Sequence, residues 1–488
     1  MQPITVVRSS VELRPDPRRI ITKSYLPEGM IDGESRIQRL VHRILALSVD
    51  EAEAILAQLE ARFGERHPDL YEIFMRGFSA VEHAIPGARG LSGDMRQLIG
   101  AYFSHEYSLE ASALTNPSIV AAPDQAGVPE SSLRVVVSLR SIGEGHLSSI
   151  EFRTGLVTED GDIELEVPRP PMRGERRSPM FDKRVFTTKL DEMGAADRLV
   201  ELALARLADR FTMAELDQAL SELVALEPAS EAVQHTSHLL HWLASSNYEV
   251  TFPGDSDVSQ RVLFPDSPAE SRGMEDARFV RFVDGDGSIT YLATYTAYDG
   301  LTILPPLIET TDFISFRIAT LNGRAAMNKG IAFFPRRVGG RYVALARGDG
   351  EGNQIMWSEK LRFWDDAETI QTPTRPWELM QVGNAGSPIE TDAGWLVVTH
   401  GVGPMRQYAL GAVLLAIDEP GRVIGHLREP ILVPDETERD GYVPNVVYSC
   451  GSLAHAGRLV IAYGSSDTSA KFASLSVDSL LERLTRVR

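Results

Sequence analysis

The chain has 488 residues, 43% hydrophobic and 24% charged, a composition typical of soluble globular proteins that excludes a disordered, collagen-like or membrane-spanning chain. Its 49 basic and 68 acidic residues give a net charge of −19 without a local basic patch, so we expect neither nucleic acid nor a membrane as partner. Cys450 is the sole cysteine, which excludes an intrachain disulfide and a thiolate metal cluster. The N-terminus lacks the continuous apolar core of a signal peptide, so we expect a cytoplasmic protein.

The N-terminal part, residues 1–110, is predicted to be a helical region. Ile37, Leu40, Val41 and Ile44 follow the i, i+3, i+4, i+7 spacing of one helix face, and similar spacing recurs up to about residue 104. The segment 48–51 has the form of a capping box that opens a second helix. We therefore expect a helical hairpin or a small bundle.

The pattern then changes from helices to short strands and back again. Residues 133–139 and 148–153 are β-rich runs separated by a glycine-bearing turn, which predicts a hairpin within residues 111–165. A Pro- and Arg-rich linker covers 167–177. Helical periodicity returns after it, with a second capping box at 212–215, so residues 166–247 are predicted to be a helical insertion.

From residue 248 onward the chain divides into units of about 45–55 residues, each with three short strands, a period typical of propeller blades. The units are 277–320, 330–363, 387–417 and 443–477. The block 116–158 has the same form and gives a fifth unit. The predicted fold is mainly β: a five-bladed β-propeller with an N-terminal helical region and a helical insertion between the first two blades, the other four blades lying in 248–488. A β-sandwich with added helices is the alternative.

Generic catalytic signatures are absent from the sequence. There is no phosphate-binding loop of the G-x-x-x-x-G-K-[ST] type, no H-E-x-x-H and no G-x-S-x-G. His235, His238 and His241 are spaced by three residues on a predicted helix, but steps of three fall about 60° short of a helical turn, so the outer pair diverges. We expect no metal site.

The segment 273–278 is a stronger candidate. Glu275, Asp276 and Arg278 stand at the start of an apolar strand, where the inner strand of a blade would begin and where all blades converge on one concave site. Because successive strand residues point to opposite faces, we expect at most one of Glu275 and Asp276 to face that site. Taken alone, the segment could equally be a solvated local ion pair.

Polar groups recur at matching places in the other units. Asn328 and Lys329 precede one strand, and His400 and Asp467 follow two others. Singly, each would be a surface charge or a loop residue. If the units surround one central axis, polar residues at equivalent positions of each unit lie near that axis. We therefore expect these residues to lie close together in one site.

These motifs together resemble glycoside hydrolase family 130, which comprises inverting β-mannoside phosphorylases and hydrolase relatives and folds as five-bladed propellers. The resemblance covers about 116–158 and 248–477. It is carried by Gly273-Met274-Glu275-Asp276-Ala277-Arg278, Asn328-Lys329-Gly330, Gly386-Ser387-Pro388-Ile389, His400-Gly401-Val402, Pro430-Ile431-Leu432-Val433-Pro434, Gly441-Tyr442-Val443-Pro444-Asn445 and Tyr463-Gly464-Ser465-Ser466-Asp467.

The resemblance also implies roles for particular residues. Asp276 matches the catalytic acid of the family. The residues that it implies for substrate binding are Arg140, Glu275, Arg278 and Asp467. Those that it implies for phosphate binding are Asn328, Lys329, Arg347, His400 and Tyr408. Ala277, Gly330 and Thr399 depart from the usual family residues, so the mannosidic linkage stays open.

The chemistry favours one function over two alternatives. Phosphate arrives as an anion, so one carboxylic acid and a cationic pocket suffice, whereas an inverting hydrolase needs a second carboxylate, here Glu275 or Glu390, to activate water. We expect an inverting phosphorylase that converts a β-mannoside and inorganic phosphate into α-mannose 1-phosphate, with no further cofactor. A β-mannosidase, or a non-catalytic propeller that binds sugar or protein, is the alternative. The helices would narrow the pocket entrance or build a homo-oligomer interface.

Overall fold

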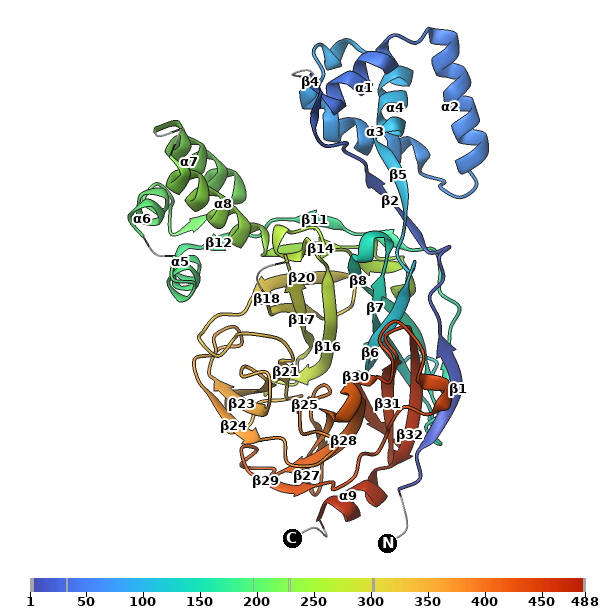
Figure 1. Cartoon of the computed structure of the whole chain (residues 1–488), viewed down its shortest axis with the longest axis vertical. Helices are drawn as coiled ribbons and strands as arrows, with labels where there is room; N and C mark the ends of the chain where they lie inside the picture. Colours follow the sequence, from blue (N-terminus) through green and yellow to red (C-terminus); the bar gives the residue numbers. More distant parts are fainter. Residues whose placement is uncertain are drawn as a thin grey trace. The chain divides into compact units, whose positions relative to one another are not determined.

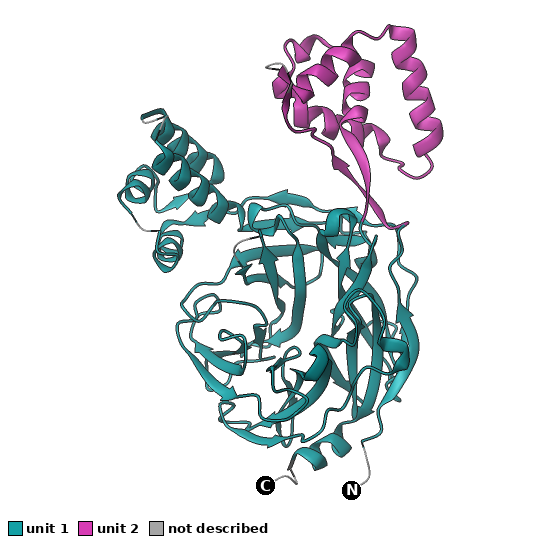
Figure 2. Cartoon of the chain, viewed as in Figure 1, with its two compact units in different colours: residues 1–17, 109–488 teal, residues 18–108 magenta. Residues whose placement is uncertain are grey.

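The computed structural model describes residues 4–31, 34–195, 197–226, 228, 230–300 and 303–485. The chain divides into two compact units, coloured separately in Figure 2. Residues 18–108 form the helical unit, and residues 1–17 with 109–488 form the sheet unit. Among the described residues, no helix combines the length and apolar character needed to cross a membrane.

The helical unit contains the predicted helices. They are α1 (Arg36–Leu45), α2 (Val49–Phe63), α3 (Leu70–Val81) and α4 (Gly93–Tyr102), and the short strand pairs are β2 (Ile20–Ser24) with β5 (Ser104–Ser108) and β3 (Met30–Ile31) with β4 (Glu34–Ser35). The capping box at Ser48 and Glu51 is confirmed, and a second one at Ser35 and Gln38 opens α1. The strands were not predicted, because β2 and β5 pair across 80 residues of sequence.

The sheet unit contains five sheets of four or more strands, which we number along the chain (Figure 1). The first sheet comprises β6 (Ala113–Ala121), β7 (Leu133–Ile142), β8 (Ser148–Val157), β9 (Ile163–Leu165), β10 (Met172–Arg173) and β15 (Arg261–Leu263). The second sheet comprises β11 (Glu175–Arg177), β14 (Tyr248–Thr251), β16 (Met274–Val283), β17 (Ile289–Tyr298), β18 (Ile303–Leu304), β19 (Pro306–Thr310) and β20 (Ser315–Thr320).

The remaining three sheets follow the predicted units. The third sheet comprises β21 (Ala332–Phe333), β22 (Tyr342–Ala346), β23 (Asn353–Ser358) and β24 (Ala367–Gln371). The fourth comprises β25 (Gln381–Asn384), β26 (Ile389–Thr391), β27 (Gly394–Val402), β28 (Tyr408–Leu415) and β29 (Val423–His426). The fifth comprises β1 (Val7–Leu13), β30 (Val447–His455), β31 (Arg458–Ser465) and β32 (Ser469–Ser476), and α9 (Val477–Thr485) follows it.

Strand β1 shows where the sequence prediction of the N-terminal region was incomplete. Its residues pair antiparallel with β32, from Val7 opposite Ser474 to Leu13 opposite Ala470. Arg8 on this strand also contacts the buried carboxylate of Glu438. The fifth sheet therefore combines the two ends of the described chain, a pairing that local sequence pattern cannot show.

Each sheet contacts the next along the chain, and β30 of the fifth sheet contacts β6 of the first. A buried apolar cluster lies at each of these junctions. Representative pairs are Phe152 with Phe279 (first and second sheets), Phe282 with Phe333 (second and third), Phe334 with Trp395 (third and fourth), Leu414 with Leu459 (fourth and fifth) and Val137 with Val460 (fifth and first). Each pair of neighbouring sheets thus has a common hydrophobic core, because a single sheet cannot bury its faces without a neighbour.

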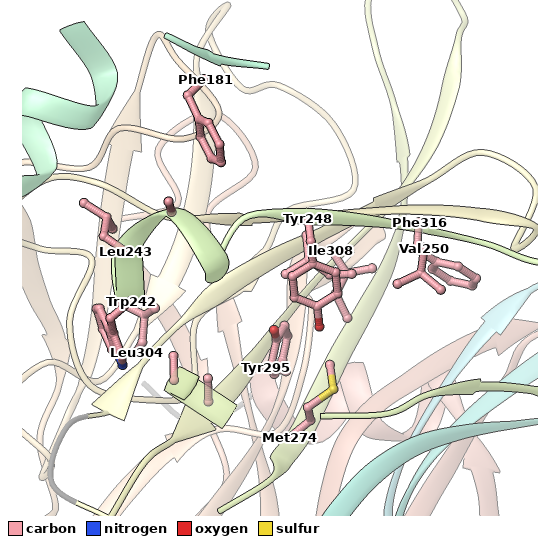
Figure 3. Close-up of a cluster of buried hydrophobic side chains, with 14 of the residues drawn as sticks. Phe181, Trp242, Leu243, Tyr248, Val250, Met274, Tyr295, Leu304, Ile308 and Phe316 are labelled. Carbon is pink, nitrogen blue, oxygen red and sulfur yellow. The ribbon is translucent and has the colours of Figure 1, made fainter. Parts of the chain in front are cut away.

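The helical insertion packs on the second sheet. It consists of β12 (Phe181–Asp182), α5 (Lys183–Glu192), α6 (Arg198–Leu204), β13 (Arg210–Phe211), α7 (Met213–Leu226) and α8 (Glu231–Ser245). Trp242 and Leu243 of α8 belong to the same buried cluster as Leu304 and Ile308 (Figure 3). The predicted linker 167–177 is not a free connection, because β10 and β11 within it join the first and second sheets.

The segment 321–330 connects the second sheet to the third, and we call it the junction loop. The Trp364 N–H donates to the Asn322 carbonyl of this loop at 2.8 Å, and the Ala325 N–H donates to the Trp364 carbonyl at 2.9 Å. Gly323 has a positive φ of 96°, and a Cβ there would lie 2.1 Å from the Trp364 carbonyl oxygen. Only glycine fits this close approach of two backbones.

We expect Gly323→Ala to destabilise the protein by about 2–4 kcal/mol, because it adds a backbone clash to the strain of a left-handed residue. Gly287→Ala is the matched control, since Gly287 has a φ of 83° but open space around it. The control should cost about 1 kcal/mol. Urea denaturation measures both, and equal losses for the two variants would contradict the clash.

Candidate active site

A cavity of about 140 Å³ gathers side chains from the first, second, fourth and fifth sheets and from the loops next to the third. Four basic and three acidic side chains line it. The lining residues are Asn116, Arg140, Glu275, Asp276, Lys329, Arg347, Gln381, Arg406, Tyr408, Val443, Val446, Tyr448 and Asp467. The structure therefore brings together seven of the residues singled out from the sequence: Arg140, Glu275, Asp276, Lys329, Arg347, Tyr408 and Asp467.

Glu275 and Asp276 both line this cavity, so the expectation that at most one of them faces the site is wrong. The pairing of β16 with β17 shifts register between Glu275 and Arg278, which is a β-bulge. Asp276 within the bulge has a φ of 56°, in the left-handed region. The bulge breaks the alternation of side chains and turns two successive carboxylates to one side.

Asn116 is a functional residue that the sequence reading missed. Its Nδ2 donates to Asp276 Oδ1 at 2.5 Å, and it too has a left-handed backbone, with a φ of 47°. A register shift between Thr115 and Ser118 gives β6 the same bulge as β16. An alignment of the first and second repeat units at these strands would have found Asn116 opposite Asp276.

The acidic side of the cavity is organised around Arg140. Its Nη2 donates to Glu275 Oε1 at 2.6 Å, its Nε donates to Ser148 Oγ at 2.9 Å, and its Nη1 lies 3.9 Å from Asp276 Oδ1. Burial raises the pKa of Glu275 despite this partner. Burial, with the nearby charge of Asp276, raises the pKa of Asp467 to about 6.

Lys329 and Arg347 line the cavity and both act electrostatically on His400, and we call this pair the basic wall. Arg406 also lines the cavity, but it acts on Asp467. Gln381 and Tyr408 add polar groups to the lining, with Gln381 Nε2 donating to the Tyr408 hydroxyl at 3.4 Å. Within the described residues, the buried Nε of Arg347 has no hydrogen-bond partner. In a chain of charge −19, the two basic side chains of this wall make a local site for an anion.

His400 lies behind this wall and orients Arg347. Its Nδ1 is 3.1 Å from the Asn384 carbonyl, which only accepts, so Nδ1 carries the proton. Nε2 then accepts from Arg347 Nη1 at 2.8 Å. Burial and the charges of Arg347 and Arg278 hold the pKa of His400 well below its usual value, so the ring is neutral and leaves the positive charge to the guanidinium.

Three other predicted residues lie outside the cavity lining. Arg278 is fully buried and donates to the Asn384 carbonyl and to the Tyr448 hydroxyl, so it holds a wall residue and does not face the cavity. Asn328 turns its amide to the carbonyl oxygens of Arg347 and Gly348, at 3.3 and 3.4 Å. Glu390 forms a surface ion pair with Arg336 at 2.5 Å.

Arg406 and Asp467 occupy similar turns at one end of the sheets. Arg406 lies in the β27–β28 turn with a φ of 56°, and Asp467 lies in the β31–β32 turn with a φ of 49°. Strained backbones of this kind concentrate at functional sites, where the surrounding fold maintains them. Arg406 could not be predicted from a sequence motif, because it reaches the cavity only through the conformation of this turn.

Comparisons with known proteins identify relatives of this chain. A family model described as β-1,4-mannooligosaccharide phosphorylase matches residues 247–486. A 1,2-β-oligomannan phosphorylase from Thermoanaerobacter sp. (strain X514) is 34% identical over 219 residues, which are 43% of this chain and 71% of the relative. A β-1,2-mannobiose phosphorylase from Listeria innocua is 30% identical over 46% of this chain and 63% of its own.

A solved structure of a β-1,2-mannobiose phosphorylase from Listeria innocua, in complex with β-1,2-mannobiose, covers 78% of this chain and 93% of its own. Its TM-score is 0.44 at 19% sequence identity. The sequence relatives carry the assignment, because the match to the Thermoanaerobacter protein spans more than two thirds of that protein. The chain belongs to glycoside hydrolase family 130, as its motifs had indicated.

Proposed function

We propose that this protein is an inverting β-mannoside phosphorylase, which transfers a mannosyl group to inorganic phosphate and releases α-mannose 1-phosphate and a shortened acceptor. The observation that carries the proposal is that the basic wall of Lys329 and Arg347 and the carboxyl group of Asp276 line one cavity. The sequence relatives named as mannoside phosphorylases support it. The mannosidic linkage is left to experiment.

The proposed scaffold is a five-bladed β-propeller in which the five sheets are the blades. Its support is that consecutive sheets share buried clusters and that the fifth sheet contacts the first. The first blade lies in residues 111–165 and the other four in 248–488. The helical regions 1–110 and 166–247 are additions to this ring, apart from β1, which extends the last blade, and β10 and β11, which extend the first two.

In the proposed reaction, Asp276 donates a proton to the glycosidic oxygen as the bond to the anomeric carbon breaks. A phosphate oxygen forms the new bond from the opposite face, which inverts the configuration. The Asp276 carboxylate then regains a proton from solvent or phosphate. Asn116, which donates to Oδ1 of Asp276, fixes the orientation of the carboxyl group.

The remaining wall residues divide between the two substrates. Arg140, Glu275 and Asp467 would hold the mannosyl hydroxyls through charge-assisted hydrogen bonds. Lys329, Arg347 and Tyr408 would bind phosphate, with His400 and Asn328 supporting Arg347 from behind. Phosphate is the co-substrate, and the proposal needs no other cofactor. A cytoplasmic location and a homo-oligomer remain expectations from the sequence.

An inverting β-mannosidase is the second candidate, because two further carboxyl groups, Glu275 and Asp467, line the cavity. Glu275 is bound to Arg140, which restricts its use as a base toward water. Glu390, the other base considered from the sequence, pairs with Arg336 outside the cavity lining. A non-catalytic sugar-binding propeller is the third candidate.

The primary test is the consumption of β-mannobioses of different linkage with and without inorganic phosphate. We expect consumption of at least one linkage to depend on phosphate and to yield a sugar phosphate. Asp276→Asn should lower kcat by about 10²–10⁴-fold and leave sugar binding intact, because only the proton donor is lost. Release of free mannose at the same rate without phosphate would identify a hydrolase. A parent protein that binds the sugar without turning it over, and an Asp276→Asn variant that binds it equally well, would identify a binding module.

The basic wall makes a separate prediction. Lys329→Met and Arg347→Met should each raise the KM for phosphate by roughly 10–100-fold, because each removes a charged hydrogen-bond donor to the anion. The KM for the mannoside should change much less. Arg336→Met removes an arginine that pairs with Glu390 away from the cavity and is the matched control. Equal effects of the control and the wall variants on the phosphate KM would contradict the assignment.

The raised pKa of Asp467 predicts that Asp467→Asn stabilises the protein at pH 7.5. Between about pH 4 and 6 the folded state binds a proton at Asp467 that the unfolded chain does not, so the parent gains stability as the pH falls through about 6. The variant has no such titration. We expect an advantage of about 2–3 kcal/mol at pH 7.5 that largely disappears at pH 4.5, measured by urea denaturation. A parent more stable than the variant at pH 7.5 would contradict burial as the dominant cause.

A further inference from the structure

The helical insertion reaches the junction loop that carries Lys329. Lys189 of α5 is buried, and its Nζ donates to the Leu321 carbonyl at 2.7 Å. Glu192, one turn further along α5, accepts from the Gly323 N–H at 2.7 Å. Lys189 and Glu192 also pair with each other at 3.3 Å. The ion pair of Lys189 and Glu192 therefore holds the start of the loop at the two residues that precede and follow Asn322 in the chain.

A second part of the insertion holds the residue just before the loop. Asn247, which follows α8, accepts from the Thr320 N–H at 3.0 Å and from the Thr320 hydroxyl at 3.4 Å. Trp242 and Leu243 of α8 pack into the core of the second sheet, as Figure 3 shows. Asn247 therefore follows a helix that is packed into the core, and its contacts hold Thr320 in place.

The far end of the junction loop is held by the site itself. The Gly330 carbonyl accepts from Asn384 Nδ2 at 2.8 Å, and the Asn328 amide donates to the Arg347 carbonyl at 3.3 Å. Lys329 lies between these two contacts and faces the cavity. The position of Lys329 therefore depends on these contacts, on the contacts at the start of the loop and on the backbone hydrogen bonds to Trp364 between them.

The contacts of Lys189 and Glu192 are costly to lose. Leu321 and Gly323 are buried, so an unpaired carbonyl or N–H there would lose its hydrogen bond without gaining water. Burial lowers the pKa of Lys189, and Glu192 beside it favours the charged form. Without the ion pair, the Leu321 carbonyl and the Gly323 N–H would need other hydrogen-bond partners, and we expect the loop to shift to reach them.

We propose that Lys189 and Glu192 are positioning residues that hold the junction loop and thereby place Lys329 for phosphate. The inference rests on the proposed phosphorylase function. Both residues lie outside residues 247–486, the part of the chain that the family model matches. The insertion is then a component of the phosphate side of the site, in addition to any role at the surface.

The sugar side of the cavity has a different support, so the effect should be selective. Arg140 and Glu275 bind each other, and Arg140 also binds Ser148 of the first sheet. Asp276 is held by Asn116 of the first sheet. The proposal therefore predicts a change in phosphate KM with little change in mannoside KM, a separation that general destabilisation would not produce.

The experiment compares Lys189→Met with Lys183→Met in the full chain. Lys183 opens the same helix and its Nζ donates to the Leu207 carbonyl at 2.9 Å, within the insertion. We expect Lys189→Met to raise the KM for inorganic phosphate by roughly 3–30-fold, the range of coupling through packed contacts, with the mannoside KM within about twofold of the parent. Lys183→Met should leave both constants at parental values.

If Lys189→Met does not fold, the double variant Lys189→Met with Glu192→Gln replaces it, because the double variant leaves no unpaired buried charge. We expect the same rise in the phosphate KM for the double variant. Phosphate-dependent turnover in the parent with an unchanged phosphate KM in the folded variant overturns this inference alone. Equal rises in both KM values also overturn it, since they indicate a general disturbance. A parent whose turnover ignores phosphate overturns the proposed function itself, so the two failures are distinguishable.

Discussion

The site depends on one local distortion, the bulge in β16 that places Asp276 in the left-handed region. A regular strand would send Glu275 and Asp276 to opposite faces, and the cavity would have one carboxylate fewer. The bulge is maintained by neighbours on β6, since Asn116 donates to Asp276 and Ser118 Oγ accepts from the Phe279 N–H at 3.1 Å. Strain at Asp276 is thus offset by contacts between the first two sheets, which the folding of the surrounding core supplies.

Charge is distributed across the cavity in a way that suits two different ligands. Arg140 and Glu275 neutralise each other on one side, and Lys329 and Arg347 carry positive charge beside His400. Since the chain as a whole is strongly acidic, this wall is a local exception. The neutral state of His400 matters here, because a second cation behind Arg347 would repel it and disturb its orientation.

Much of this architecture could be predicted from the sequence, because it follows local patterns. The strands of the repeat units and the capping box at Ser48 appear as expected, and the motif at 273–278 lies at the start of β16, as predicted. The pairing of β1 with β32 could not be predicted, since it joins residues more than 450 positions apart. Nor could the orientation of Asp276, the role of Asn116 or the aim of Arg406, because each depends on a left-handed backbone that no residue pattern specifies. Arg278 and His400, predicted to bind substrate and phosphate, are buried outside the cavity lining and contact it through Tyr448 and Arg347.

The central claim is that Asp276 and the basic wall together transfer a mannosyl group to phosphate with inversion. Combined ¹H and ³¹P nuclear magnetic resonance of the reaction, started with β-mannobiose and inorganic phosphate, tests it most directly. The account predicts that the first product formed is a mannosyl phosphate ester with the α configuration, appearing in step with the released acceptor sugar. Free mannose as the first product, with the phosphate signal unchanged, would contradict it.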